Sequence, residues 1–283
     1  MLSVVVDPGR LAAGIVDSLG EILVRDRVGT PGREVWRSLE QLVRRVLAAR
    51  PEDIPAPTAV GVSCAGPVDL PAGAVSPMLL PAWAGFPLRE RLEDLTGLPT
   101  RLDSLGGAAI NAERWVGEAV DTPSCVLLLL DQTIESACVV DGIRLHGAHG
   151  NAGSIAHLDV EPGGLRCPCG AEGCLTVYAT TTALEAEMNR PLRRATPSII
   201  ERTGIMAGRA IASTSAVLDV TTFLLGGSVV DAFGDPFLDA LRRELALRSR
   251  LSHLDGLRVV ELSGFAQPLV AAASVVLRPA ELV

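Results

Sequence analysis

The sequence predicts an α/β protein of two lobes, each built on a mixed β-sheet covered by helices. Three consecutive strands open the chain, at residues 4–7, 11–17 and 21–28, and helices then alternate with strands. This order is typical of a mixed sheet with helices on its faces. A second strand-rich opening begins near residue 124, and 283 residues are enough for two lobes.

In the first lobe, the hydrophobic pattern assigns the remaining elements. Residues 33–50 place Val35, Leu39, Leu42 and Val46 at helical spacing, with arginines on the opposite face. Similar signals predict strands at 57–69 and 100–104, and helices at 86–99 and 108–120.

The second half begins with strands and ends with a helix. Asp141-Gly142 between two apolar runs indicates a hairpin, and Gly226-Gly227 indicates a turn after a strand. The other expected elements are strands at 124–131, 221–230 and 259–264, and helices at 236–251 and 266–277.

Composition excludes several classes of function. The formal net charge is −8 and no basic stripe is present, which argues against direct nucleic-acid binding. Every basic residue is arginine, so lysine chemistry such as Schiff-base formation is excluded. The opening residues lack the charged region of a signal peptide, and the longest apolar runs are too short to span a bilayer. We expect a soluble, cytoplasmic protein.

One histidine and three cysteines form a candidate metal site: His157, Cys167, Cys169 and Cys174. One nitrogen and three sulfur ligands suit tetrahedral Zn²⁺. A disulfide is the alternative, but it leaves one of the three cysteines unpaired, and a reducing cytoplasm disfavours the bond. Because four protein ligands fill the tetrahedron, we expect the zinc to be structural and the chemistry to lie elsewhere.

The stretch AGSIAHLDVEPGGLRCPCGAEGCLTVYAT resembles the zinc-containing signature of the ROK family (repressor, open reading frame, kinase), which is G-E-x-G-H followed by C-x-C-G-x-x-G-C-x-E. Further segments, VVVDPGRLAAGIVD, LLGGSVV and GFAQPLVAAASVVL, also resemble the family, so the resemblance covers nearly the whole chain. It implies a two-lobed, actin-like ATPase (RNase H-like) fold with a cleft between the lobes. Residues 1–104 would form a small N-terminal lobe, on which the closing helix 266–283 packs. Residues 105–265 would form a large lobe with the zinc loop 157–174.

A sugar kinase of this family uses the Asp of an N-D-x-N motif as general base, and the resemblance places Asp103 in that role and in contact with substrate. Leucines stand where the motif has its two asparagines. The alternative is that Asp103 or Ser104 only caps the following helix, since both are strong N-cap residues. The sequence leaves these two interpretations open.

The phosphate-binding loops depart from the family pattern. The first, D-x-G-G-T, corresponds to Asp7-Pro8-Gly9-Arg10-Leu11, in which Asp7 and Gly9 remain as cofactor-binding candidates. The second, G-T-G-x-G-G-G, corresponds to residues 130–137, which contain no glycine. Asp131 and Glu135 place negative charge there, and this charge opposes phosphate binding. Gly226 and Gly227, expected near adenosine, are kept. ATP-Mg²⁺ is therefore a doubtful cofactor.

The expected sugar contacts are weakened as well. The two family glutamates correspond to Ser154 and Thr176, and an asparagine corresponds to Met78. His157 remains, although zinc alone would explain it. A site that depends on hydrogen bonds to a sugar loses affinity when they are removed. We interpret His146, His149 and His253 as loop or surface residues.

Three functions stay open. The first is a non-catalytic member, a pseudokinase, that binds a small molecule such as a sugar, or a partner protein. The second is an ATP-dependent hexose or N-acetylhexosamine kinase that uses Asp103 as its base. The third is a sugar-responsive transcriptional regulator that acts through a partner, because no DNA-binding domain precedes the first strand. The resemblance also leads us to expect a homodimer.

Overall fold

The computed structural model describes residues 1–248, 251–262 and 267–278, which divide into two compact units. Unit 1 contains Met1–Asp121, Ile143–Ala152 and, among the described C-terminal residues, 267–278. Unit 2 contains Thr122–Gly142 and the described residues from 153 to 262. The first division thus falls after Asp121, not at the lobe boundary expected after residue 104.

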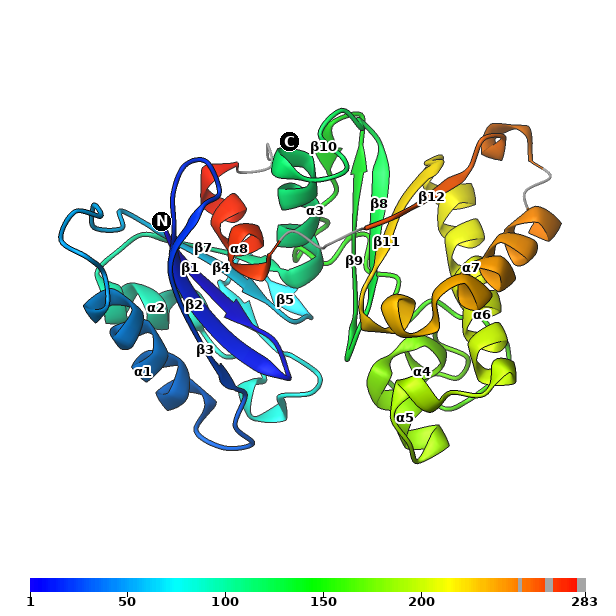
Figure 1. Ribbon diagram of the computed structural model, residues 1–283, viewed down its shortest axis with the longest axis horizontal. Helices are drawn as coiled ribbons and strands as arrows, with labels where there is room; N and C mark the ends of the chain where they lie inside the picture. Colours follow the sequence, from blue (N-terminus) through cyan, green and yellow to red (C-terminus); the bar gives the residue numbers. More distant parts are fainter. Residues whose placement is uncertain (249–250, 263–266, 279–283) are drawn as a thin grey trace. The chain divides into compact units, whose positions relative to one another are not determined.

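Unit 1 is built on a five-stranded mixed sheet (Figure 1). The two outer pairings on one side are antiparallel and the other two pairings are parallel. The strands, in spatial order, are β3 (Ile22–Gly29), β2 (Arg10–Val16), β1 (Leu2–Val6), β4 (Val60–Cys64) and β7 (Thr100–Ser104).

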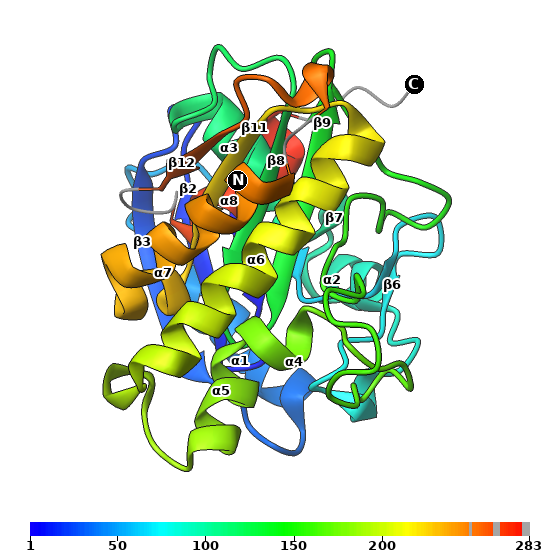
Figure 2. The ribbon, with the colours of Figure 1, turned by 90° about the vertical axis from the view of Figure 1, so that its right-hand side faces the viewer.

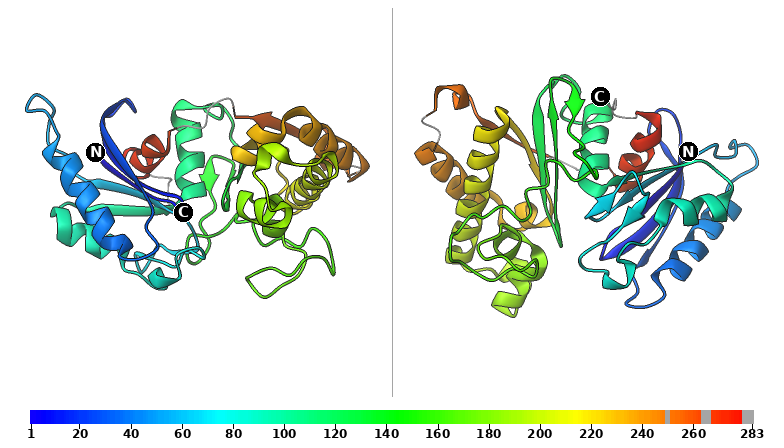
Figure 3. Two further views of the ribbon diagram at one scale, coloured as in Figure 1. Left: turned by 60° about the horizontal axis from the view of Figure 1, so that its bottom comes forward. Right: turned by 180° about the vertical axis from the view of Figure 1, so that it is seen from behind.

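Helices cover both faces of this sheet, as Figures 1 and 3 show. On one face, α1 (Val35–Ala48) and α2 (Leu88–Thr96) pack through leucines and valines that include Leu39 and Leu92. On the other face, α8 (Pro268–Leu277) packs through Leu269 against Val5 and Ala12. Helix α3 (Leu105–Val116) packs against α8, where the Ser274 hydroxyl donates a hydrogen bond to the Ala108 carbonyl (3.2 Å). This contact explains why the structure groups α3 with unit 1.

Unit 2 is built on a second mixed sheet, to which it contributes β9 (Ile134–Val140), β8 (Cys125–Leu130), β11 (Thr222–Gly226) and β12 (Arg258–Glu261), in this spatial order. The pair β8–β9 is antiparallel, and β11 lies parallel to both β8 and β12. The long helices α6 (Pro197–Leu218) and α7 (Ser228–Arg248) lie side by side in Figure 2. An ion pair between Arg209 and Glu244 joins them (3.2 Å).

The short elements complete both units. Two short helices, α4 (Thr176–Ala179) and α5 (Thr181–Met188), follow the candidate metal loop. The others are β5 (Val68–Asp69), β6 (Ala74–Val75), β10 (Ile143–Arg144) and the 3-10 turns η1 (Pro81–Trp83), η2 (Leu192–Arg194) and η3 (Ser252–Leu254). Among the residues that the structure describes, no helix has both the length and the hydrophobicity needed to cross a lipid bilayer.

The structure confirms most predicted elements and corrects one. The hairpin at Asp141-Gly142 is present, and both residues have positive φ (50° and 82°), as a type I′ turn requires. The helix expected at 236–251 instead begins at Ser228 and is interrupted at Gly234 (φ 55°, ψ −144°). Residues 228–230 at its start fall within the strand predicted at 221–230, because the β-branched Val229 and Val230 favour strands. The ends of the elements predicted at 236–251, 259–264 and 266–277 include residues outside the described part.

Candidate functional site

The predicted zinc ligands converge in unit 2. One side-chain ligand atom from each of His157, Cys167, Cys169 and Cys174 lies within 4.8 Å of the others. Cys167 Sγ is 3.5 Å from His157 Nδ1, and Cys169 Sγ is 3.7 Å from Cys174 Sγ. A tetrahedral zinc ion with Zn–S bonds of about 2.3 Å separates its sulfur ligands by about 3.8 Å. The residues present therefore fit Zn²⁺.

The fold of the loop explains this convergence. A tight turn brings the cysteines together, since the Gly170 N–H donates to the Cys167 carbonyl (2.9 Å) and the Cys167 N–H to the Ala171 carbonyl (2.8 Å). The Leu165 N–H donates to the Tyr178 hydroxyl at 2.7 Å. Arg209 on α6 fixes the start of the loop, because it pairs with the carboxylate of Glu161. The ligand set is thus attached to a long helix of unit 2.

The protonation states of these side chains determine which protons a bound metal would have to displace. Burial raises the pKa of the Cys167 thiol, and it raises the pKa of Cys174 to about 12. Burial lowers the pKa of His157, so its ring is neutral and has a lone pair to offer. A zinc ion would stabilise the thiolates and release their protons. With four protein ligands it would leave no coordination position for a substrate, so its role would be structural.

Asp103, the candidate base, lies one residue before the end of β7 and is 4% exposed. Its Oδ2 accepts a hydrogen bond from the buried guanidinium of Arg144. Its Oδ1 accepts from the N–H of Ser104 at 2.7 Å. Both carboxylate oxygens are therefore engaged within the protein.

The helix cap at this position is Ser104. Its hydroxyl accepts the Gly107 N–H at 3.0 Å, in the first turn of α3. Of the two residues considered for capping, the structure thus assigns the role to Ser104 and gives Asp103 a different partner. The contact between Asp103 and a substrate stays a prediction.

Arg144, the partner of Asp103, was not found from the sequence. It lies two residues after the Asp141-Gly142 turn, at a distance of 41 residues from Asp103 along the chain. The sequence shows only an arginine at the end of a short strand, and an arginine there is ordinarily expected to be exposed to solvent. Nearby, burial and then the charge of Arg144 lower the pKa of His146, so this histidine is neutral near pH 7.

The first phosphate loop is closed by its own hydrogen bonds. The N–H of Gly9 donates to Asp7 Oδ1 (2.8 Å). The backbones of Asp7 and Arg10 exchange two hydrogen bonds at 3.1 Å, and the Thr30 hydroxyl donates to the Asp7 carbonyl (2.7 Å). The Gly9 amide, which was expected to face a phosphate, therefore already has an anionic acceptor.

Asp131 belongs to the segment that corresponds to the second phosphate loop, and it lies in unit 2. Its Oδ1 accepts the Ser228 N–H (2.8 Å) at the start of α7, and its carbonyl accepts the Thr181 N–H (2.8 Å). Helix N-termini attract anions, and here a carboxylate of the chain itself lies at the start of α7. Gly227 has φ +107°, and a Cβ there would lie 2.5 Å from the Leu130 carbonyl oxygen. The glycine is thus required for the close approach of this turn to β8.

The predicted sugar contacts have local partners or face solvent. The Thr176 hydroxyl donates to the Ala156 carbonyl (2.6 Å), while Ser154 and Met78 are exposed. His149 Nδ1 lies 3.6 Å from Asp69 Oδ2 at the surface. Asn151, which sequence reasoning missed, holds the N–H and the carbonyl of Val68 with its side-chain amide (2.9 and 2.7 Å).

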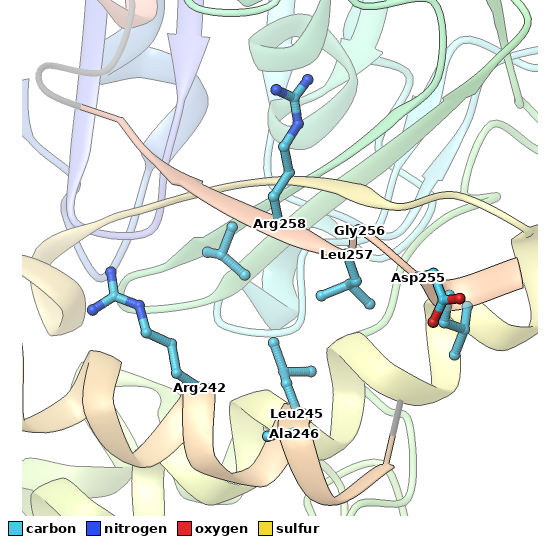
Figure 4. A pocket seen from close by; sticks show the side chains of 9 residues that line it. Arg242, Leu245, Ala246, Asp255, Gly256, Leu257 and Arg258 are labelled. Carbon is cyan, nitrogen blue, oxygen red and sulfur yellow. The ribbon is translucent and has the colours of Figure 1, made fainter. Parts of the chain in front are cut away.

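A separate hollow of about 430 Å³ lies between α7 and β12 (Figure 4). It contains none of the predicted site residues. Of its two arginines, Arg242 pairs with Glu261 (3.2 Å), and Arg258 Nε donates to the Thr222 hydroxyl (3.1 Å). Both cations therefore have partners, and this hollow is not the candidate site.

Comparison with known proteins identifies the family. The model of the ROK family matches residues 4–255. The glucokinase of Streptomyces coelicolor is 27% identical over 278 residues, which cover 86% of this chain and 86% of the relative. The glucokinase of Halalkalibacterium halodurans is 32% identical over 126 residues, which cover 44% of this chain but only 38% of the relative.

Solved structures agree with this match. The crystal structure of a ROK hexokinase from Thermus thermophilus has a TM-score of 0.79 and 27% identity, and the match covers 97% of this chain and 96% of that chain. The two mixed sheets with flanking helices are those of the actin-like ATPase class to which these kinases belong. The family match spans most of the sequence, and the chain belongs to the ROK family.

Proposed function

We propose that this chain is a kinase-like protein that binds a small molecule without transferring phosphate. The observation that carries this proposal is the buried pair of Asp103 and Arg144. A general base must reach the substrate hydroxyl and accept its proton. The carboxylate of Asp103 instead accepts one hydrogen bond on each oxygen, from the Ser104 N–H and from the Arg144 guanidinium, so both oxygens are already held within the protein.

The state of the phosphate loops supports the same proposal. Asp7 takes the Gly9 amide, and Asp131 takes the Ser228 amide at the start of α7. Phosphoryl transfer depends on backbone N–H groups and cations that neutralise phosphate. Carboxylates in these places repel phosphate instead.

The ligand that we propose is a sugar or a sugar-like molecule. The relatives are named glucokinase and hexokinase, and the fold that they share with this chain supports a hexose-sized ligand. The protein would act through a change in shape on binding, alone, as a homodimer or through a regulatory partner. A structural zinc ion at His157, Cys167, Cys169 and Cys174 would hold the loop of unit 2 in place.

The second candidate is an ATP-dependent hexose or N-acetylhexosamine kinase. It is favoured by the position of Asp103 at the end of a parallel strand, where ligands bind in α/β folds, and by the Gly227 turn. In this case Asp103 would have to leave Arg144 when substrate binds.

The test is binding of a panel of hexoses and N-acetylhexosamines, measured by thermal shift and isothermal titration without nucleotide. We expect at least one sugar to raise the melting temperature, as a ligand that binds only the folded state does. Any sugar that binds is then incubated with ATP-Mg²⁺, and ADP is measured. Binding without ADP production supports the proposal. ADP production that Asp103→Asn abolishes supports the kinase. No binding by any sugar contradicts the sugar ligand.

A further inference from the structure

Three arginines project from one face of the β2–β3 hairpin in unit 1. Strand pairing places Arg27 opposite Ala12 and Arg25 opposite Gly14. Opposite residues of an antiparallel pair lie on the same face, as do residues two apart on one strand. Arg10, Arg25 and Arg27 therefore share the face on which Ala12 packs against α8.

These arginines line a hollow. Its volume is about 340 Å³, and it is bounded by Arg10, Ala12, Arg25, Asp26, Arg27, Gln267, Pro268 and Leu269. Ala12 contributes a small apolar side chain to the hollow, and Pro268 and Leu269 are its other apolar lining residues.

 Because these apolar residues lie beside three arginines, the hollow offers a ligand both apolar contact and a concentrated positive charge.

The arginines of the hollow have no carboxylate partner among the residues that the structure describes. Within the described residues, Arg10, Arg25 and Arg27 form no ion pair, whereas Asp26 is bound by Arg45 of α1 (2.8 Å). The hydrogen bond from Arg45 holds the pKa of Asp26 below its usual value, so this carboxylate is charged and is balanced by Arg45. Within the described part of the chain, no carboxylate therefore pairs with the three guanidinium groups at the hollow.

Helix α8 adds to this charge. The helix starts at Pro268, directly after Gln267, and both residues line the hollow. The N-terminus of a helix carries a partial positive charge. It thus reinforces an anion site that the arginines already define.

We propose that this hollow binds a small molecule that carries two or more phosphate-like groups. Arginine recognises such oxyanions through paired N–H donors. Residues two apart on a strand are separated by about 6.8 Å, and neighbouring strands by about 4.8 Å. One oxyanion cannot contact three arginines spread over these distances as fully as a chain of linked oxyanions can. The site lies entirely within unit 1 and does not depend on kinase activity.

The experiment is isothermal titration of the full chain with inorganic tripolyphosphate, and with sulfate as a single oxyanion. We expect tripolyphosphate to bind with one site per chain, at least about tenfold more tightly than sulfate, and more weakly as salt is raised. The double variant Arg25→Gln/Arg27→Gln should weaken this binding by at least about tenfold, because it removes two charged donors.

The matched control is Arg37→Gln/Arg44→Gln, which removes the same charge from the exposed side of α1. It should change the affinity by less than about twofold. Equal losses in both double variants, or no binding of tripolyphosphate to the wild type, would overturn the proposal. Should the first variant fold poorly, as judged by its melting temperature, Arg25→Lys/Arg27→Lys keeps the charge and should bind more weakly than the wild type because lysine lacks the paired donors.

Discussion

The carboxylate of Asp103 and the guanidinium of Arg144 form an ion pair whose side chains are 6% and 1% exposed. The two residues come from the end of β7 and from β10, so the pair joins distant parts of unit 1. A charge buried this deeply requires its partner, because solvation by water is lost. The pair therefore occupies the position at which the family resemblance predicts the general base of a sugar kinase.

Removal of either partner of this ion pair should destabilise the protein. We expect Arg144→Met to lower the free energy of unfolding by about 3–5 kcal/mol, since it leaves Asp103 buried without a cation. The double variant Asp103→Leu/Arg144→Met should recover much of this loss. Urea denaturation of the two single variants and the double variant measures the coupling. If the single variants Asp103→Leu and Arg144→Met each cost less than about 1 kcal/mol and their effects add in the double variant, the pair does not stabilise the fold.

Zinc removal should lower the melting temperature of the wild type but not that of a variant that lacks Cys169. This cysteine is exposed, so its truncation to alanine removes little packing and acts mainly through the metal. We expect Cys169→Ala to lose stoichiometric zinc and to lower the melting temperature. After chelation with EDTA, the wild type and the variant should melt at nearly the same temperature. Metal analysis together with calorimetry checks this, and an unchanged zinc content in the variant would contradict the ligand set.

The carboxylate of Asp131 should stabilise the start of α7. We expect Asp131→Ala to lower the free energy of unfolding by about 1–2 kcal/mol, because the Ser228 N–H and the positive end of the helix lose their anion. Gln132→Ala is the control, since the side chain of this neighbour is exposed. Equal, small losses in both variants would mean that the Asp131 hydrogen bond is not stabilising.

The pair of Glu187 and Arg202 predicts a pH dependence. Hydrogen bonds from Arg202 lower the pKa of Glu187 from 4.5. A lowered pKa means that the unfolded state binds more protons, so this stability is complete above pH 4.5 and is lost as the pH falls through the folded pKa. Glu187→Gln should therefore lower stability by about 0.5–1 kcal/mol at pH 7 and by much less near pH 3. Unfolding curves at both pH values check this, with Glu52→Gln as a control that should show no such change.

The packing of α8 on the sheet predicts an intolerant glycine. A Cβ at Gly61 on β4 would collide with the backbone carbonyl of Ala272 in α8. Since neither backbone can move freely, Gly61→Ala should destabilise the protein by about 1–3 kcal/mol or more. Gly29→Ala on β3 meets no atom within 4 Å and should change stability little. Chemical denaturation of both variants compares them directly, and similar midpoints would contradict the close approach of α8.

Local patterns in the sequence predicted much of the fold. Leu39, Leu42 and Val46 recur at helical spacing and are fully buried in α1, and Asp141-Gly142 forms the expected turn. The cluster of candidate metal ligands was predicted because four residues of ligand type lie close together along the chain. These features depend on residues that are close together along the chain, so they can be recognised in a single sequence.

The features that were missed depend on contacts between distant residues. Arg144 meets Asp103 across 41 residues, and Ser228 meets Asp131 across 97 residues. The sequence could show that Asp131 brings negative charge to a phosphate loop, but not that a helix N-terminus accepts it. The division after Asp121 likewise follows from the packing of α3 on α8, which no local pattern encodes.

The most direct test of the account is sugar-dependent ADP production from ATP-Mg²⁺, with glucose and with N-acetylhexosamines at saturating concentrations. The glucokinase of Streptomyces coelicolor serves as the positive control under the same conditions. We predict no sugar-dependent ADP above the background of the Asp103→Asn variant, because the carboxylate of Asp103, the predicted base, is bound to Arg144. Turnover comparable to that of the control, abolished by Asp103→Asn, would contradict the account and establish a working sugar kinase.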